Sequence, residues 1–173
     1  MKENLSQLLE SIYGKSIQIK CVEPIPGGCI NETQVLKLSN GEQVFLKYNP
    51  SPPMNFFNAE TEGLRLLGKP KYGPRVPLFL GISNELNPQF LLLEYIETST
   101  PKDGFASRFG QALAEMHRET QEQYGLDHDN FIGKTIQKNN LELDGLVFFR
   151  EHRIRFQQEL ARKTRGLPKA MDN

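Results

Sequence analysis

The sequence contains two adjacent glycines and a lysine, which are residue types that can bind a phosphate group. Gly27 and Gly28 lie in the segment PGGCINET, and Lys47 lies in the apolar segment VFLKY. Glycines at a turn let the backbone approach an anion, and their N–H groups can point toward it. A lysine on the neighbouring strand can reach the same phosphate oxygens. The alternative is an ordinary glycine turn beside a lysine that points into water, and these residues alone leave both interpretations open.

Glu60 favours the phosphate interpretation, because it lies on the apolar side of a predicted helix. Phe57, Leu64 and Leu67 define that side, and Glu60 follows Phe57 by three positions. A carboxylate among apolar residues is costly without a partner. Lys47 is the natural partner, and the pairing would orient its other N–H donors toward phosphate. The alternative places Glu60 at a half-exposed edge of the apolar side.

The end of the segment FLLLEYIE is a candidate for binding a planar heterocycle such as adenine. The contacts would be made mainly by main-chain groups. The residues concerned are Leu93, Glu94, Tyr95 and Ile96. By itself the pattern indicates only a buried strand with a polar end.

These residues need a sheet and a helix to position them, and the hydrophobic pattern predicts both. Helical spacing predicts helices over 3–13 and about 54–68. Alternating or continuous apolar runs predict five strands, over 16–25, 32–39, 42–48, 78–83 and 89–96. The pair Asn40-Gly41 favours a tight hairpin turn between the second and third of them.

The pattern changes after residue 97. The small polar segment ETSTPKDG, with Pro101 and Gly104, predicts a linker over 98–104. No strand is predicted beyond it. Instead we expect a helix with an apolar stripe, an irregular segment over 124–139 and a long last helix with Asp144 as its N-cap. The expected stripe of the first helix is Phe105, Phe109, Leu113 and Met116, and the shared side of the last is Leu146, Phe149, Arg153, Phe156 and Leu160.

The composition argues against nucleic acid and membrane partners. The 21 basic and 21 acidic residues give no net charge, and the longest apolar runs are too short to cross a bilayer. Only two cysteines occur, Cys21 and Cys29, without zinc spacing, so we expect a reduced, cytoplasmic setting. Cys21 is predicted to be an inert core residue.

Cys29 lies in the glycine turn, where N–H groups and Lys47 would favour its thiolate form. We hypothesise that its oxidation, including an intermolecular disulfide that links a homodimer, blocks nucleotide entry. The alternative is a small residue that simply fits the turn.

In chain order, the glycine turn, strand lysine, helix glutamate and strand-to-linker segment resemble the N-terminal lobe of the protein-kinase-like fold. Longer segments resemble the fructosamine kinase (ketosamine-3-kinase) family. They are PGGCINET, VFLKYN, FNAETEGLRLL, LLLEYIE, FGQALAEMHRET, GLDHDNFIGKTIQKN and FFREHRIRFQQELA. The parts DNFIGKT and FFREHRIR are the most specific, because distant kinases share the glycine loop and the lysine but not these.

The resemblance implies an α+β fold and the ATP-dependent phosphorylation of a sugar hydroxyl on a ketosamine. The substrate would be a free or protein-bound adduct of a sugar and an amine, which falls apart once phosphorylated, so the family is linked to deglycation. The nucleotide loop would contain Gly27, Gly28 and Asn31. Lys47 would hold the phosphates and pair with Glu60, and residues 93–96 would form the adenine hinge.

The resemblance also implies a nucleotide-binding lobe over 1–97, a hinge over 98–104 and the beginning of a helical lobe over 105–173. The family's catalytic loop, similar to H-G-D-L-W, and its later metal-binding aspartate have no match in this sequence. The segments at His117 and His152 lack the required aspartate. We therefore expect no catalytic residue in this chain, magnesium ligands beyond residue 173, and a truncated chain that is inactive alone.

Two other functions remain open. An aminoglycoside or choline kinase relative would share the glycine loop, Lys47 and Glu60, but the segments DNFIGKT and FFREHRIR argue against it. A non-catalytic remnant of the fold, or a nucleotide-binding module, is favoured by the missing catalytic loop. The run Asp127, His128 and Asp129 is interpreted as a polar turn rather than a metal site, because adjacent ligands do not easily converge on one ion.

Overall fold

The computed structural model describes residues 2–28, 30–83 and 88–165. It divides into two compact units, Met1–Glu119 and Thr120–Asn173. The predicted α+β class is confirmed. The first unit includes the helix that follows the predicted linker, so the compact units divide at a different point from the predicted lobes. The lobe boundary at 98–104 stays a prediction.

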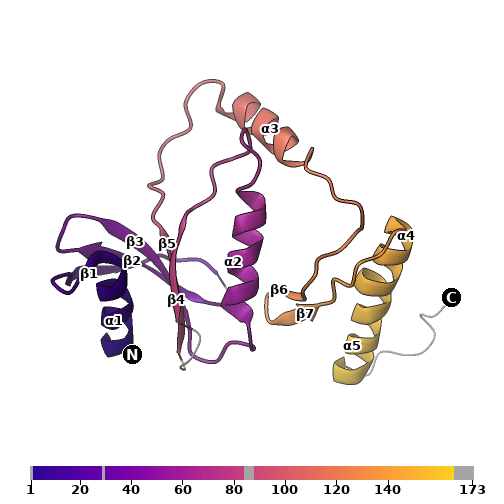
Figure 1. Ribbon diagram of the computed structural model, residues 1–173, viewed down its shortest axis with the longest axis horizontal. Coiled ribbons are helices and arrows are strands. Elements are labelled where there is room, and N and C mark those ends of the chain that lie inside the picture. Colours follow the sequence, from indigo (N-terminus) through magenta and orange to yellow (C-terminus); the bar gives the residue numbers. More distant parts are fainter. Residues whose placement is uncertain (1, 29, 84–87, 166–173) are drawn as a thin grey trace. The chain divides into compact units, whose positions relative to one another are not determined.

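The first unit contains a five-stranded antiparallel sheet with strand order β1-β2-β3-β5-β4 (Figure 1). Its elements, in chain order, are α1 (Lys2–Tyr13), β1 (Ile19–Pro24), β2 (Glu32–Leu38), β3 (Gln43–Asn49), α2 (Phe56–Leu67), β4 (Phe79–Ser83), β5 (Gln89–Glu94) and α3 (Phe105–Met116). All five predicted strands and both predicted helices before the linker are present. Four of the five strands are shorter than predicted, and β3 keeps the predicted length but is shifted by one residue. The difference is clearest at β1, because a turn bonds Ile17 N–H to Gly14 O at 3.2 Å before it.

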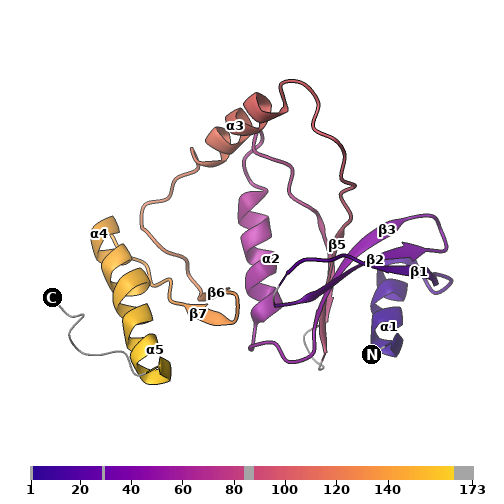
Figure 2. The same ribbon diagram turned by 180° about the vertical axis from the view of Figure 1, so that it is seen from behind.

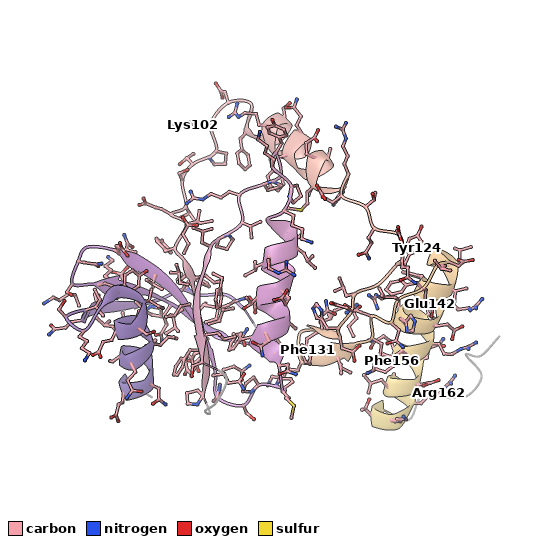
Figure 3. The ribbon with its side chains drawn as sticks, viewed as in Figure 1. Lys102, Tyr124, Phe131, Glu142, Phe156 and Arg162 are labelled. Carbon is pink, nitrogen blue, oxygen red and sulfur yellow. The ribbon has the colours of Figure 1, made fainter. Side chains whose placement is uncertain are left out.

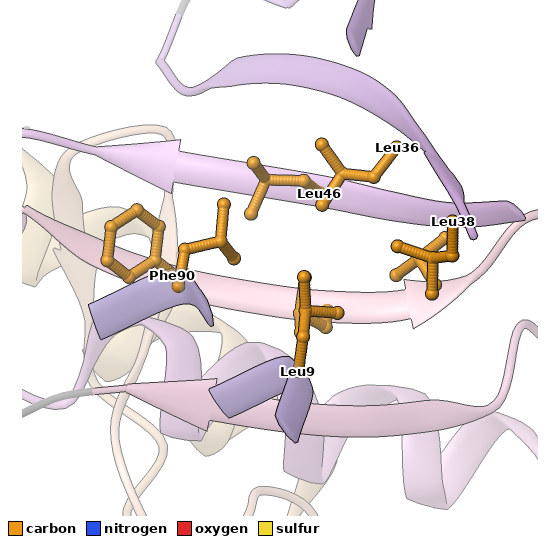
Figure 4. Packing of buried hydrophobic residues seen from close by; sticks show 8 residues of the cluster. Leu9, Leu36, Leu38, Leu46 and Phe90 are labelled. Atoms are coloured by element: carbon orange, nitrogen blue, oxygen red, sulfur yellow. The ribbon is translucent and has the colours of Figure 1, made fainter. Parts of the chain in front are cut away.

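The main core lies between α1 and one face of the sheet. Alternate residues of three central strands point to that face, since successive side chains of a strand alternate. They form one cluster with α1, and its buried members are Leu5, Leu9, Leu36, Leu38, Val44, Leu46, Phe90 and Leu92. Figure 4 shows Leu9 of α1 facing these strands, and its side chain is 1% exposed.

The helix α2 covers the opposite face of the sheet, against β4 and β5 (Figures 1 and 2). Phe57 of α2 is fully buried, and Leu91 and Leu93 of β5 are buried as well. Leu64 is half-buried, but Leu67 in the last turn of α2 is 46% exposed, so the predicted apolar side ends before it. This face also receives Lys47, because Val44 and Leu46 point into the α1 core.

The second unit contains a hairpin where the sequence predicted an irregular segment. Its elements are β6 (Asn130–Ile132), β7 (Thr135–Gln137), α4 (Gly145–Phe148), η1 (Phe149–Arg155) and α5 (Phe156–Arg165). The prediction that no strand follows the linker is therefore wrong. Gly133, with φ of +61°, begins the turn between the two strands. Three-residue strands are too short for an alternating pattern to be recognised.

Asp144 caps the last helix, as predicted, since its Oδ1 accepts hydrogen bonds from the N–H groups of Leu146 at 2.7 Å and Val147 at 3.2 Å. The predicted shared side of this helix is not buried at its beginning, because Leu146 is 82% and Phe149 58% exposed. A π-helical turn over η1 changes the spacing from that of an α-helix, so a stripe drawn with α-helical spacing does not continue through it.

The predicted stripe of α3 lies on one side of that helix but is not buried in the part of the chain that the structure describes. Phe105 and Phe109 stack with centroids 5.9 Å apart, and both are about half exposed, at 49% and 47%. Among residues 2–28, 30–83 and 88–165, no helix combines the length and the apolar character needed to cross a membrane.

Cys21 is exposed, so its prediction as a core residue is wrong. It lies on β1, an edge strand whose residues beyond Ile19 are all exposed. Cys29, and with it the hypothesis of a redox-linked homodimer, lies outside the described residues.

The α1 core predicts a large effect for one substitution. Leu9→Ala removes a buried side chain and should lower the free energy of unfolding by about 2–5 kcal/mol. Urea unfolding followed by far-UV circular dichroism measures this change. The control is Leu67→Ala in α2, which should cost less than about 1 kcal/mol because Leu67 is exposed. Equal effects of the two substitutions would contradict the packing of α1 against the sheet as the main core.

Candidate functional site

Lys47 and Glu60 are in contact, as the sequence predicts. The Lys47 Nζ donates a hydrogen bond to Glu60 Oε1, and each side chain is 25% exposed. Partial burial strengthens such a pair relative to a pair in bulk water, because the effective dielectric constant is lower. The ammonium group has three N–H donors, so the contact leaves others for a further partner.

The sheet and α2 fix both members of this pair. Lys47 lies on β3, directly opposite Thr33 of β2 and Leu91 of β5, so its backbone is held on both sides. Glu60 lies one helical turn beyond the buried Phe57, which anchors α2 to the sheet. The i, i+3 spacing thus aims Glu60 at the face of the sheet where Lys47 points.

The glycine turn joins β1 to β2, the strand that pairs with β3. Gly27 and Gly28 have φ of +120° and +95°, a region that residues other than glycine rarely adopt. The turn is closed by two hydrogen bonds, Ile25 N–H to Thr33 O at 2.9 Å and Thr33 Oγ1 to Ile25 O at 3.0 Å. Since Thr33 is opposite Lys47, the turn leads into the strand next to that of the lysine.

Asn31 is tied to a residue that sequence analysis missed. The buried Asn49, at the end of β3, donates from Nδ2 to Asn31 Oδ1 at 2.9 Å and to Ile30 O at 3.3 Å. Its Oδ1 accepts from Ser51 N–H at 3.0 Å. Asn49 therefore holds the end of the turn against β3, and in the sequence only its position at the end of the strand could have indicated this. The predicted nucleotide contact of Asn31 stays a prediction.

The predicted adenine hinge begins where β5 ends. Leu93 is buried, and Glu94, Tyr95 and Ile96 are half-buried. The strand stops at Glu94, two residues earlier than predicted, so Tyr95 and Ile96 leave the sheet. Because they lie outside the strand, their main-chain groups are not part of the sheet ladder. Their contact with adenine stays a prediction.

The Glu94 side chain has partners of its own. Its Oε1 accepts from Arg75 Nη2, and its Oε2 accepts from Leu78 N–H at 3.2 Å. The Leu78 N–H and then the Arg75 guanidinium lower the pKa of Glu94 below its usual value. Sequence analysis missed Arg75, because a loop arginine 19 positions from its partner leaves no periodic signal.

In the second unit, Arg153 of η1 joins the two segments most specific to the resemblance. Its Nη2 donates to Asn139 Oδ1 at 2.6 Å and its Nη1 to Lys138 O at 2.5 Å. The guanidinium carbon lies 4.5 Å from the centroid of the Phe148 ring. Burial lowers the pKa of Arg153. Asn139, 1% exposed, donates in turn to Asn130 Oδ1 at 2.9 Å.

The acidic run of the second unit is engaged in local contacts. Asp129 accepts from Lys138 Nζ at 2.5 Å, and Asp127 Oδ1 lies 2.6 Å from His128 Nδ1. Across the described ranges, no group of three metal-ligating side chains is assembled. Figure 3 shows Tyr124 and Glu142 together beside the last helix, where their main chains exchange hydrogen bonds of 2.8 and 2.9 Å. His152 Nε2 lies 3.1 Å from Glu142 Oε1, so this histidine is part of the packing of the unit.

Comparisons with known proteins point to one family. A family model described as fructosamine kinase matches residues 1–172. A protein of Enterococcus faecium named a probable ketoamine kinase is 35% identical over 143 residues, which are 83% of this chain and 49% of the relative. A protein-ribulosamine 3-kinase of Oryza sativa subsp. indica is 35% identical over 150 residues, 85% of this chain and 43% of the relative.

A solved structure gives the same result for the fold. The chain superposes on a structure named a putative fructosamine-3-kinase, from Haemophilus somnus, with a TM-score of 0.83 and 31% identity. The match covers 95% of this chain and 56% of that one. The chain thus spans about half the length of the curated relatives that it matches.

The Arg153 network predicts a specific weakness of the second unit. Arg153→Ala removes two charge-assisted hydrogen bonds and should lower the free energy of unfolding by about 1.5–3 kcal/mol. It should also speed hydrogen exchange at the Asn139 amide. Arg155→Ala is the control, because Arg155 pairs with Glu151 at the surface and its substitution should cost less than about 0.5 kcal/mol. Unchanged exchange at Asn139 in the Arg153 variant would contradict the network.

Proposed function

Because this chain belongs to the fructosamine kinase family, we propose that it forms the nucleotide-binding part of an ATP-dependent kinase that phosphorylates a sugar hydroxyl of ketosamines. The relatives named as ketoamine and ribulosamine kinases support this substrate class. The phosphorylated adduct is unstable, so the proposed biological outcome is deglycation. The proposed setting is the cytoplasm, where ATP is available and thiols stay reduced.

The observation that supports the proposal most is the contact between Lys47 and Glu60. Glu60 fixes the ammonium group in one place, and the remaining N–H donors of Lys47 then bind phosphate oxygens. Fixing the lysine before the nucleotide arrives lowers the entropy that binding costs. The backbone N–H groups of the glycine turn add donors on the neighbouring strand.

The residues of the first unit fit a nucleotide. Lys47 has N–H donors left for the phosphates, and the glycine turn with positive φ offers main-chain N–H groups to them. The segment that follows β5 offers main-chain groups to the base. ATP supplies the phosphoryl group that the proposed reaction transfers. The magnesium ligands and the aspartate that positions the attacking hydroxyl are proposed to come from residues that this sequence does not contain. We therefore expect the 173-residue chain to bind nucleotide without phosphoryl transfer.

Thermal stabilisation by MgATP tests the proposed site. A ligand at about 100 times its Kd stabilises the folded state by about 2.7 kcal/mol. For a chain of this size that raises the Tm by roughly 5–10 °C. Lys47→Ala should lose most of this shift, because the phosphates lose their main cation. Differential scanning calorimetry with and without MgATP measures it.

Lys37→Ala is the matched control for that experiment. Lys37 is also a strand lysine paired with a glutamate, Glu23, but both side chains are exposed and lie on β2 and β1. Its substitution should leave the MgATP shift unchanged. The proposal fails if the wild-type chain is not stabilised by MgATP, or if Lys47→Ala retains the full shift.

A further inference from the structure

Glu94, the last residue of β5, makes an unusual hydrogen-bond pattern with Leu78, the residue just before β4. Glu94 N–H donates to Leu78 O at 2.8 Å. In an antiparallel ladder such a pair normally exchanges both bonds, so Leu78 N–H should return to the main-chain carbonyl of Glu94. It instead donates to the Glu94 carboxylate, to Oε2 at 3.2 Å. The side chain thus takes the place that the main-chain oxygen of the same residue would have.

Arg75 holds the carboxylate in that position. Its Nη2 donates to Glu94 Oε1, while Leu78 N–H binds Oε2, so both oxygens are engaged. The Leu78 N–H and the Arg75 guanidinium both stabilise the ionised carboxylate, and they lower the pKa of Glu94. The Glu94 side chain is 25% exposed, whereas that of Arg75 is 66% exposed. These two contacts therefore fix the Glu94 side chain at the point where the chain leaves the sheet.

The consequence concerns the main-chain carbonyl of Glu94. In a strand, the N–H and C=O of one residue point to the same side, so this carbonyl faces the side of Leu78. Because Leu78 N–H is bound by the carboxylate, it does not compete for the carbonyl. The carbonyl remains available as an acceptor at the start of the predicted hinge.

We propose that the Glu94 carboxylate, held by Arg75, is a positioning group that reserves the Glu94 main-chain carbonyl for the amino group of a nucleobase. This inference rests on the nucleotide site proposed above. Adenine carries an amino group at its 6-position and donates to such a carbonyl. Guanine carries an oxygen there, so two acceptors would meet without a hydrogen bond. The arrangement therefore selects ATP over GTP.

Two substitutions of Glu94 separate this role from general support of the sheet. In Glu94→Ala, Leu78 N–H is released and can bond the main-chain carbonyl, which extends the ladder and competes with the base for this acceptor. The affinity for ATP should fall about 5–10-fold and that for GTP should stay within about twofold. In Glu94→Gln, the amide oxygen still accepts from Leu78 N–H. The NH2 group of the amide cannot accept from Arg75, so the ratio of ATP to GTP affinity should fall as in Arg75→Ala, by about two- to threefold, and less than in Glu94→Ala.

Isothermal titration of the 173-residue chain with MgATP and MgGTP measures these affinities. Both nucleotides share the triphosphate and the ribose, so a loosened fold would weaken them equally. Glu62→Ala is the control, because Glu62 pairs with Arg65 at the exposed side of α2 and should change neither affinity. Arg75→Ala gives a second test that does not depend on the folding of a Glu94 variant, and should lower the ATP to GTP ratio about two- to threefold.

The outcomes are distinguishable. An ATP to GTP ratio that is unchanged in Glu94→Ala, or unchanged in Arg75→Ala if the former does not fold, overturns the positioning role and leaves the nucleotide site standing. A ratio that falls equally in Glu94→Gln and Glu94→Ala also overturns it. A wild-type chain that binds neither nucleotide overturns the proposed function, and this inference with it.

Discussion

The contact between Lys47 and Glu60 is the interaction on which the candidate site and the face of the sheet around it depend. Both groups are charged and partly buried, on the face of the sheet where Phe57, Leu91 and Leu93 are buried. Each is acceptable there only because the other is present, since a lone charge would have to be desolvated without compensation. The alternation of β3 and the anchoring of α2 by Phe57 bring the two together. The candidate site therefore depends on both the sheet and α2, because each of them positions one member of the charged pair.

Sequence analysis could predict this part because its signals are local and periodic. Alternation along VFLKY places Lys47 on the face of the strand opposite to Val44 and Leu46, and helical spacing predicted Glu60 on the same side of its helix as Phe57. The short hairpin of β6 and β7 was missed because three residues give no period. Asn49 and Arg75 were missed because their partners lie 18 and 19 positions away in the chain. Cys21 was assigned to the core because alternation alone does not say which strand forms the edge of a sheet.

The second unit explains why two segments carried the family resemblance. DNFIGKT and FFREHRIR are distant in sequence, yet Arg153 and Asn139 connect the helix of one to the hairpin of the other. The π-helical turn places His152 and Arg153 where both reach the loop around residues 138–142. A half-buried, hydrogen-bonded arginine tolerates few substitutions, because its fork geometry is specific. The specificity of these segments thus has a structural basis in this network.

A double-mutant cycle on Lys47 and Glu60, with MgATP affinity as the readout, tests the central claim most directly. If Glu60 acts by holding Lys47, then Glu60→Ala should weaken MgATP binding about tenfold in the wild-type background. In the Lys47→Ala background the same substitution should change the affinity by less than about twofold. An equal loss of affinity in both backgrounds would show that the two residues act independently, and would contradict the claim that Glu60 serves nucleotide binding through Lys47.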